Sequence, residues 1–166
     1  MSDRKNFHRF GRQELHKGFY VDSIPDEALY DIKYSDFFEY PEDDDDFPYY
    51  FAHELLCGSC HHFALSLQKL LGYKAYIIEG INERSFHAFC QIYRAGTWFY
   101  VDARGITSSF SEFMDIAKQF VSDEYVIRPV NSEDIAEWEE NSDYNTEAYA
   151  FAEAVISKYK QYYTME

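Results

Sequence analysis

The sequence predicts an α+β protein in which one central helix packs on a small antiparallel sheet, with further helices flanking this core. Apolar residues recur at helical spacing over residues 59–71, and Gly72 supplies a stop. Three runs of β-branched and aromatic residues follow, and the pair Ala95-Gly96 forms a tight turn between the last two. Helices and strands are grouped instead of alternating, which is typical of α+β folds and not of doubly wound sheets.

The elements before this core are predicted from residues that cap helices and from prolines that interrupt regular structure. Residues 1–22 carry no motif and are expected to form a short helix or an irregular arm. Ser23 has the position of a helix cap, and about ten helical residues are expected after it. Residues 39–50 contain two prolines and the acidic run 42–46, which together predict a loop. The run lacks the alternating ligands and the glycine of a calcium loop, so a solvated loop is favoured over a calcium site.

The elements from residue 73 onward are assigned from strand composition and helix caps. Ser109 with Glu112 three positions later fits a capping box, and Asn131 or Ser132 can cap a second helix. Pro129 places the last strand at an edge of the sheet. The expected elements are strands over 73–80, 85–94 and 97–103, a helix over 109–120, a strand over 124–130, a short acidic helix from 131, and a helix over 146–162.

Length and composition favour a single domain over residues 1–166, with its core at about residues 50–130. The chain is 46% hydrophobic and 20% aromatic, which argues against disorder. A formal charge of −15 repels phosphate backbones and anionic lipids, so nucleic acid and membranes are excluded as partners and a basic protein or peptide is favoured. Without an apolar leader, the three cysteines indicate a cytoplasmic protein with reduced thiols. The oligomeric state is left open.

Cys60 is the candidate nucleophile. If Ser59 is the helix cap, Cys60 lies in the first turn, where free N–H groups and the helix dipole stabilise an anion. The thiolate is the nucleophilic form of cysteine, and the same N–H groups can donate to an oxyanion. A buried cysteine at the start of a core helix is the plain structural alternative.

His87 and Asp102 are the candidate base and orienting carboxylate. Pairing about the Ala95-Gly96 turn makes the numbers of paired residues add up to about 190, so the partner of His87 falls near position 103 or 104. This places the carboxylate of Asp102 beside the imidazole, where it can fix the tautomer and stabilise the imidazolium. Taken alone, His87 could equally be a core histidine with a structural role, and Asp102 could be a turn residue at the end of a strand. The order Cys, His, Asp on helix, strand and strand favours nucleophilic catalysis.

The stretches GSCHHFALSLQKLLGYKAYIIEG and FHAFCQIYRAGTWFYVDARG resemble the core of the transglutaminase-like superfamily, within the broader group of papain-like cysteine peptidases. The match spans residues 58–105, which is about 50 of the 166 residues. The positions that match are Gly58, Cys60, Gly72, Gly80, His87, Ala88, Trp98 and Asp102. Phe89 stands where tryptophan is common in that superfamily.

This resemblance implies acyl transfer through a thioester, with Cys60 as nucleophile, His87 as base and acid, and Asp102 as orienter. It implies an amide or ester as acyl donor and leaves peptidase, transamidase and deamidase open. We expect a protein or peptide as the substrate, and neither a metal nor a cofactor. The side chain that would assist the oxyanion is also open. The candidates for it are Tyr49, Tyr50 and His53.

The same residues allow other functions. Cys57, Cys60 and His61 satisfy the C-x-x-C-H pattern of covalent haem, although no export signal is present. Zinc could be held by the cysteines with His61 or His62, but these point in different directions from the helix, and strand alternation sends Cys90 away from His87. A redox pair of Cys57 and Cys60 and a non-catalytic protein-binding module are the further alternatives.

Overall fold

The computed structural model describes residues 26–39, 47–82, 85–122, 124–140 and 144–165. The predicted arm over 1–22, the Ser23 cap and the acidic run 42–46 lie outside these ranges. The helices are α2 (Asp26–Leu29), α3 (Cys60–Leu71), α4 (Phe110–Ala117), α5 (Ser132–Glu140) and α6 (Asn145–Lys158). The strands are β1 (Lys74–Gly80), β2 (Phe86–Arg94), β3 (Thr97–Asp102), β4 (Gly105–Thr107) and β5 (Tyr125–Pro129). The mixed α+β class is therefore confirmed.

The five strands form one antiparallel sheet in the order β4-β3-β2-β1-β5. Cys90 of β2 pairs with Val101 of β3, so the register of this hairpin agrees with the predicted one to within a residue. Ala95 and Gly96 form the turn, and both have positive φ, 53° and 79°, as a two-residue hairpin turn requires. The strand β5 lies at an edge, as Pro129 predicted.

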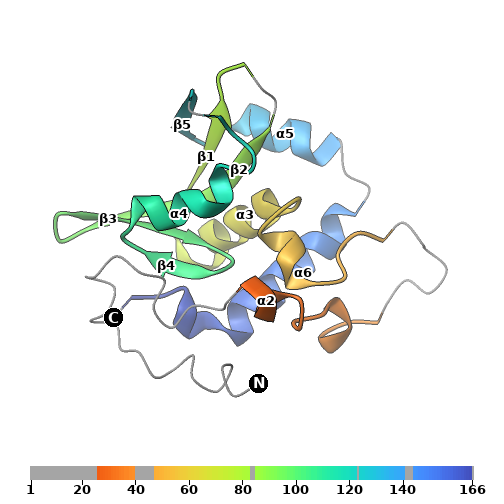
Figure 1. The fold of residues 1–166 in the computed structure, drawn as a ribbon. Coiled ribbons are helices and arrows are strands. Elements are labelled where there is room, and N and C mark those ends of the chain that lie inside the picture. The colour runs from red at the N-terminus through yellow and green to blue at the C-terminus, as the bar shows by residue number, and fades with distance from the viewer. Residues whose placement is uncertain (1–25, 40–46, 83–84, 123, 141–143, 166) are drawn as a thin grey trace.

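The helix α3 lies at the centre of the molecule and packs against both β2 and α6 (Figure 1). Ser59 takes the cap position, and Gly72 ends the helix with a φ of 75°, a left-handed conformation that glycine adopts without strain. Phe63 and Leu67 are almost fully buried on the inner face of the helix, and each such side chain contributes about 1.5–3 kcal/mol by its burial. This apolar face fixes the direction in which the first turn of α3 points.

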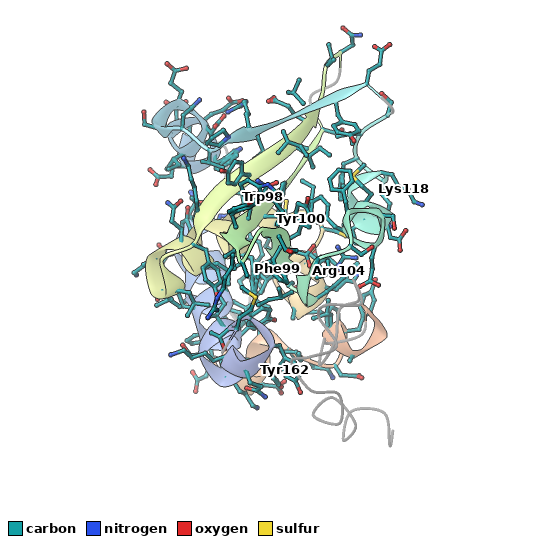
Figure 2. The ribbon with its side chains drawn as sticks, turned by 90° about the vertical axis from the view of Figure 1, so that its left-hand side faces the viewer. Trp98, Phe99, Tyr100, Arg104, Lys118 and Tyr162 are labelled. Carbon is teal, nitrogen blue, oxygen red and sulfur yellow. The ribbon has the colours of Figure 1, made fainter. Side chains whose placement is uncertain are left out.

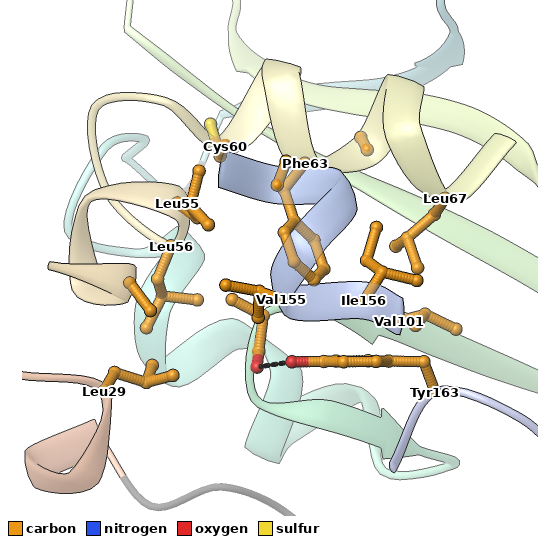
Figure 3. Close-up of a cluster of buried hydrophobic side chains, with 14 of the residues drawn as sticks. Leu29, Leu55, Leu56, Cys60, Phe63, Leu67, Val101, Val155, Ile156 and Tyr163 are labelled. Carbon is orange, nitrogen blue, oxygen red and sulfur yellow. Dashed lines mark hydrogen bonds between the residues drawn. The ribbon is translucent and has the colours of Figure 1, made fainter. Parts of the chain in front are cut away.

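The sheet is covered on both faces. The face toward α3 and α6 carries the larger core, and Figure 3 shows Phe63, Leu67, Val101, Val155 and Ile156 meeting there. Helix α4 covers the other face, where Phe113 packs on residues of β1 and β2. Two predicted caps are also present: the Ser109 hydroxyl accepts from the Glu112 amide, and Asn131 Oδ1 accepts from the Asp134 amide.

The prediction of about ten helical residues after Ser23 was wrong. The helix α2 ends at Leu29, and the chain then turns to form an isolated bridge between Lys33 and Phe51. The amide of Ala52 donates to the Ile32 carbonyl at 2.8 Å, so backbone groups that a longer helix would use are bonded to a distant segment. Long-range pairing of this kind overrides local helix propensity.

Strand β4 was not predicted, and two predicted helices are shorter than expected. Three residues, Gly105–Thr107, are too few to give a strand pattern. The helix predicted over 109–120 ends at Ala117, and α6 ends at Lys158 before a short 3₁₀ turn over Lys160–Tyr162. Among the described residues, no helix combines the length and the apolar character needed to cross a bilayer.

Candidate active site

Cys60 is the first residue of α3 and is buried, with 4% of its surface exposed. The amide of Ala88 in β2 donates to its Sγ atom at 3.2 Å. The first N–H groups of a helix also have no partner within the helix, and the helix dipole favours negative charge there. The sulfur atom therefore lies beside an N–H donor and at the positive end of the helix dipole.

The loop before α3 brings Glu54 to the same place. Gly58 has a φ of 94°, which lets the chain turn sharply into the helix, and a Cβ atom on Gly58 would come within 3.5 Å of Glu54 Oε2. The amide of Ser59 donates to the Glu54 carbonyl at 2.7 Å. Burial raises the pKa of the Glu54 carboxyl. Sequence reasoning missed Glu54, which carries no motif of its own.

His87 lies near the start of β2 and is fully buried. Its Nε2 atom is 3.4 Å from Asp102 Oδ2. Its Nδ1 atom is also buried and has no hydrogen-bond partner of standard geometry. Asp102 contacts Nε2, and Cys60 also acts on the imidazole and contributes to its raised pKa. Nδ1 is therefore the ring nitrogen that remains for Cys60.

The electrostatic surroundings of His87 favour its charged form. Burial lowers the pKa of His87, but interactions with Asp102 and then Cys60 outweigh burial and raise this pKa to about 9. These interactions therefore favour the imidazole once it has accepted a proton. Phe113 and Phe120 lie beside the ring, with centroids 5.7 and 6.1 Å away, and keep that side apolar.

Asp102 ends β3 and is 2% exposed. Burial alone would raise the pKa of its carboxyl, but Arg104 and His87 outweigh it and hold this pKa well below the usual range. Arg104 is the larger influence of the two. Its Nη2 atom donates to Asp102 Oδ2 at 2.7 Å and its Nε atom to Oδ1 at 3.1 Å.

The structure thus brings Cys60, His87 and Asp102 together from α3, β2 and β3, and adds Arg104. Sequence reasoning missed Arg104. Arg104 lies in the short turn between β3 and β4, two residues after Asp102, and no strand pattern reaches it.

The oxyanion candidates stay open. Tyr49 packs against His62, with ring centroids 5.8 Å apart. His53 stacks on Tyr30 at 4.3 Å, and Tyr50 packs on Phe47. The amides at the start of α3 are the donors whose position relative to Cys60 follows directly from the helix.

The residues of the zinc, haem and redox alternatives have other surroundings. Cys90 is fully buried, its thiol lies 3.4 Å from the Ala64 carbonyl, and burial raises its pKa. His62 Nε2 is 2.8 Å from Asn145 Oδ1, and His61 packs on Trp138. In the part of the chain that the structure describes, no three His, Cys, Asp or Glu side chains are gathered so that they could hold a metal ion. Cys57 is half-buried, and Cys57, Cys60 and Cys90 form no disulfide with one another.

His61 should make the fold acid-sensitive. Burial, and then the neighbouring His62, lower the pKa of His61 to about 3, whereas an unfolded histidine titrates near 6.5. Between these two pH values the unfolded chain therefore binds more protons at His61 than the folded chain does. The contribution of His61 to stability is fully present above pH 6.5 and is lost as the pH drops toward 3.

We expect His61→Phe to make the free energy of unfolding less dependent on pH in this window, by up to about 1.4 kcal/mol per pH unit. Phenylalanine keeps an aromatic ring against Trp138 and Phe86. Urea unfolding at pH 7, 6, 5 and 4 measures the difference between the variant and the native chain. A difference that is constant with pH would contradict the prediction.

Comparison of the sequence with protein-family models and with curated proteins found no match, and neither did comparison of the fold with solved structures.

Proposed function

We propose that this protein is a cysteine enzyme that transfers acyl groups from a protein or peptide, with Cys60, His87 and Asp102 as its catalytic triad. The observation that carries the proposal is the position of His87. Its imidazole is buried, one ring nitrogen contacts the Asp102 carboxylate, and Cys60 contributes to the raised pKa of the ring. A buried histidine between a thiol at a helix start and a carboxylate is the arrangement that nucleophilic catalysis uses.

The proposed reaction follows from these positions. His87 takes the proton of the Cys60 thiol, and the resulting thiolate attacks the carbonyl carbon of an amide or ester. The tetrahedral oxyanion accepts hydrogen bonds from amides at the start of α3. His87 then gives its proton to the leaving amine or alcohol, the bond to the leaving group breaks, and a thioester on Cys60 is left. Water or an amine attacks this thioester, with His87 as base, and the bond between the acyl carbon and Sγ breaks. The acid or the new amide leaves, and His87 returns the proton to Cys60.

The order of elements supports a transglutaminase-like core within this α+β fold. A helix that carries the cysteine is followed by antiparallel strands that carry the histidine and the aspartate, as the sequence resemblance implies. We propose no cofactor and no metal for the reaction. The net charge of −15 favours a substrate with a basic region, because opposite charge speeds encounter.

The test of the triad compares the three cysteines, all of them reduced, within one sample. We expect iodoacetamide at pH 6.5 to alkylate Cys60 faster than the more exposed Cys57, because an ordinary thiol has a pKa near 8.5 and is mostly protonated at that pH. Cys90, which is fully buried in β2, reports how often the fold opens. Peptide mass spectrometry gives all three rates from one sample.

His87→Ala should slow alkylation at Cys60 about tenfold or more, relative to Cys57 in the same sample. Cys90 controls for a fold that simply opens more often in the variant. If Cys60 reacts no faster than Cys57 in the native chain, or if His87→Ala leaves its relative rate unchanged, the triad assignment is wrong.

A non-catalytic protein-binding module is the second candidate, and the burial of the site favours it. Cys60, His87 and Asp102 expose 4%, 0% and 2% of their surfaces, which is also what core residues would show. Exposed aromatic side chains such as Tyr93 and Trp98, whose rings lie 4.9 Å apart at the end of the β2–β3 hairpin, would then supply the binding surface. This candidate predicts that Cys60→Ala leaves the biological activity intact.

A further inference from the structure

Arg104 is held at both ends of its guanidinium group. On one side it binds the Asp102 carboxylate through Nε and Nη2, and its own amide donates to Oδ1 at 3.0 Å. On the other side Nη1 donates to the carbonyl of Glu112 at 3.3 Å, and Nη2 to that of Phe113 at 3.2 Å. Figure 2 shows Arg104 inside the molecule, between β3 and the helix α4 that ends beside Lys118.

This double attachment fixes the carboxylate of Asp102. The guanidinium fork and the carboxylate form two parallel hydrogen bonds, a geometry that leaves little freedom of rotation. The chain at this point is also tied from the other side, because the Tyr163 hydroxyl donates to the Ala103 carbonyl at 2.8 Å (Figure 3). Asp102 therefore presents Oδ2 to His87 from a rigid frame.

Arg104 and His87 compete for the same oxygen. Oδ2 accepts from Arg104 Nη2 at 2.7 Å, and His87 Nε2 lies at the longer distance of 3.4 Å. The strong partner is the arginine, which is always charged. His87 therefore faces a carboxylate whose negative charge is already largely balanced, and a protonated imidazole gains less from it than from a lone carboxylate.

We infer that Arg104 is a positioning residue of this site, which orients the Asp102 carboxylate toward His87 and weakens the hold of that carboxylate on the protonated imidazole. As a positioning residue for catalysis, Arg104 rests on the proposed function. Its effect on the imidazole does not, because that effect depends only on charges and distances around His87. A general base works best when it can release its proton near the working pH, and Arg104 moves His87 in that direction.

Among the described residues, few titratable groups face His87. Cys60 faces it from α3, Asp102 from the end of β3, and Arg104 from the turn that follows β3. Tyr163 lies beside Asp102, and burial, together with the charge of Asp102, raises the pKa of its phenol. Residues of β1 and α4 present apolar side chains, Ile78 opposite His87 and Phe113 against its ring. Changing Arg104 therefore changes one charge among a small set.

The test is the titration of the His87 imidazole, followed by NMR of histidine-labelled full-length chain, with His87→Gln used to assign the signal. Removing a like charge favours the protonated form, so Arg104→Met should raise the midpoint by about one pH unit or more. Arg104→Lys keeps the charge and should keep the midpoint close to the native one. If Arg104 had only a structural role, the methionine and lysine variants would show the same titration midpoint for His87.

Arg104→Met leaves the buried Asp102 carboxylate without its partner, which could unfold the variant. A second comparison therefore uses variants that lack this carboxylate. Asp102→Asn and the double variant Asp102→Asn/Arg104→Met differ only at Arg104, and the double variant carries no buried charge from the pair. The midpoint of His87 should be higher in the double variant than in Asp102→Asn. Equal midpoints in this pair, or an unmoved midpoint in a folded Arg104→Met, overturn the inference.

The alkylation of Cys60 separates this inference from the proposed function. If His87→Ala leaves the relative rate of Cys60 unchanged while Arg104→Met still moves the His87 midpoint, the triad proposal fails and the effect of Arg104 on the imidazole stands. If the alkylation of Cys60 depends on His87 but the His87 midpoint does not depend on Arg104, the triad proposal stands and the inference about Arg104 fails.

Discussion

Asp102→Ala is expected to lower the free energy of unfolding by about 3–5 kcal/mol, because it leaves a buried arginine without its counter-charge. Arg104 is 6% exposed, and three of its hydrogen bonds end on Asp102. The measurement is urea unfolding at pH 7 with the thiols kept reduced.

Two variants control this prediction. Asp115→Ala removes the carboxylate of an exposed pair with Lys118 on the outside of α4, and exposed pairs contribute only about 0–1 kcal/mol. Asp102→Leu/Arg104→Met replaces both charges with apolar groups and should recover much of the loss. A loss below about 1 kcal/mol in Asp102→Ala would mean that the buried pair is not coupled.

The same pair sets a pH window. The Asp102 carboxyl has a pKa well below its unfolded value, which is near 3.9. Its contribution is thus fully present above about pH 4 and is lost as the pH falls through the folded pKa. Asp102 also raises the pKa of His87 to about 9, so the stability difference between native chain and Asp102→Ala should grow as the pH falls from 9 toward 6.5. It should then shrink below about pH 4, as the Asp102 carboxylate loses its charge.

The central part of the fold could be predicted because its signals are local. Apolar spacing and Gly72 define α3, and the two positive φ angles at Ala95 and Gly96 set the register of the β2–β3 hairpin. The segment after α2 could not be predicted. Its backbone pairs with Phe51, about twenty residues away, and no local pattern encodes such a pairing.

The site could be predicted only in part, for a similar reason. The relation of His87 to Asp102 followed from the hairpin register, and the place of Cys60 followed from the helix start. Arg104 escaped because its role depends on α4, whose carbonyls at Glu112 and Phe113 accept its remaining donors. The depth of the site was also not foreseen, since sequence patterns give the face of an element and not what covers it.

Burial has a consequence for the chemistry. Low polarity strengthens the interaction of His87 with both of its partners, and Phe113 and Phe120 keep one side of the ring apolar. With Cys60 only 4% exposed, a substrate carbonyl can reach Sγ only when the side chains that cover it move. Small acyl donors are therefore better first probes than long peptides.

An activated ester such as p-nitrophenyl acetate should acetylate Cys60 selectively, and His87→Ala should slow this acylation by about 10²–10⁴-fold, the usual contribution of a general base. The expected product is an acetyl thioester on the Cys60 peptide, with release of nitrophenolate in equal amount. Cys60→Ala should abolish the fast phase of nitrophenolate release. Stopped reactions analysed by mass spectrometry measure both.

Cys57→Ser is the matched control, since it removes the neighbouring and more exposed thiol while leaving the start of α3 unchanged. It should keep the fast phase, because Cys57 lies outside the helix that stabilises the thiolate. Acetylation shared equally by Cys57 and Cys60, or a rate at Cys60 that His87→Ala does not change, would show that the thiol at the helix start is chemically ordinary. A non-catalytic protein-binding module would then be the better supported function.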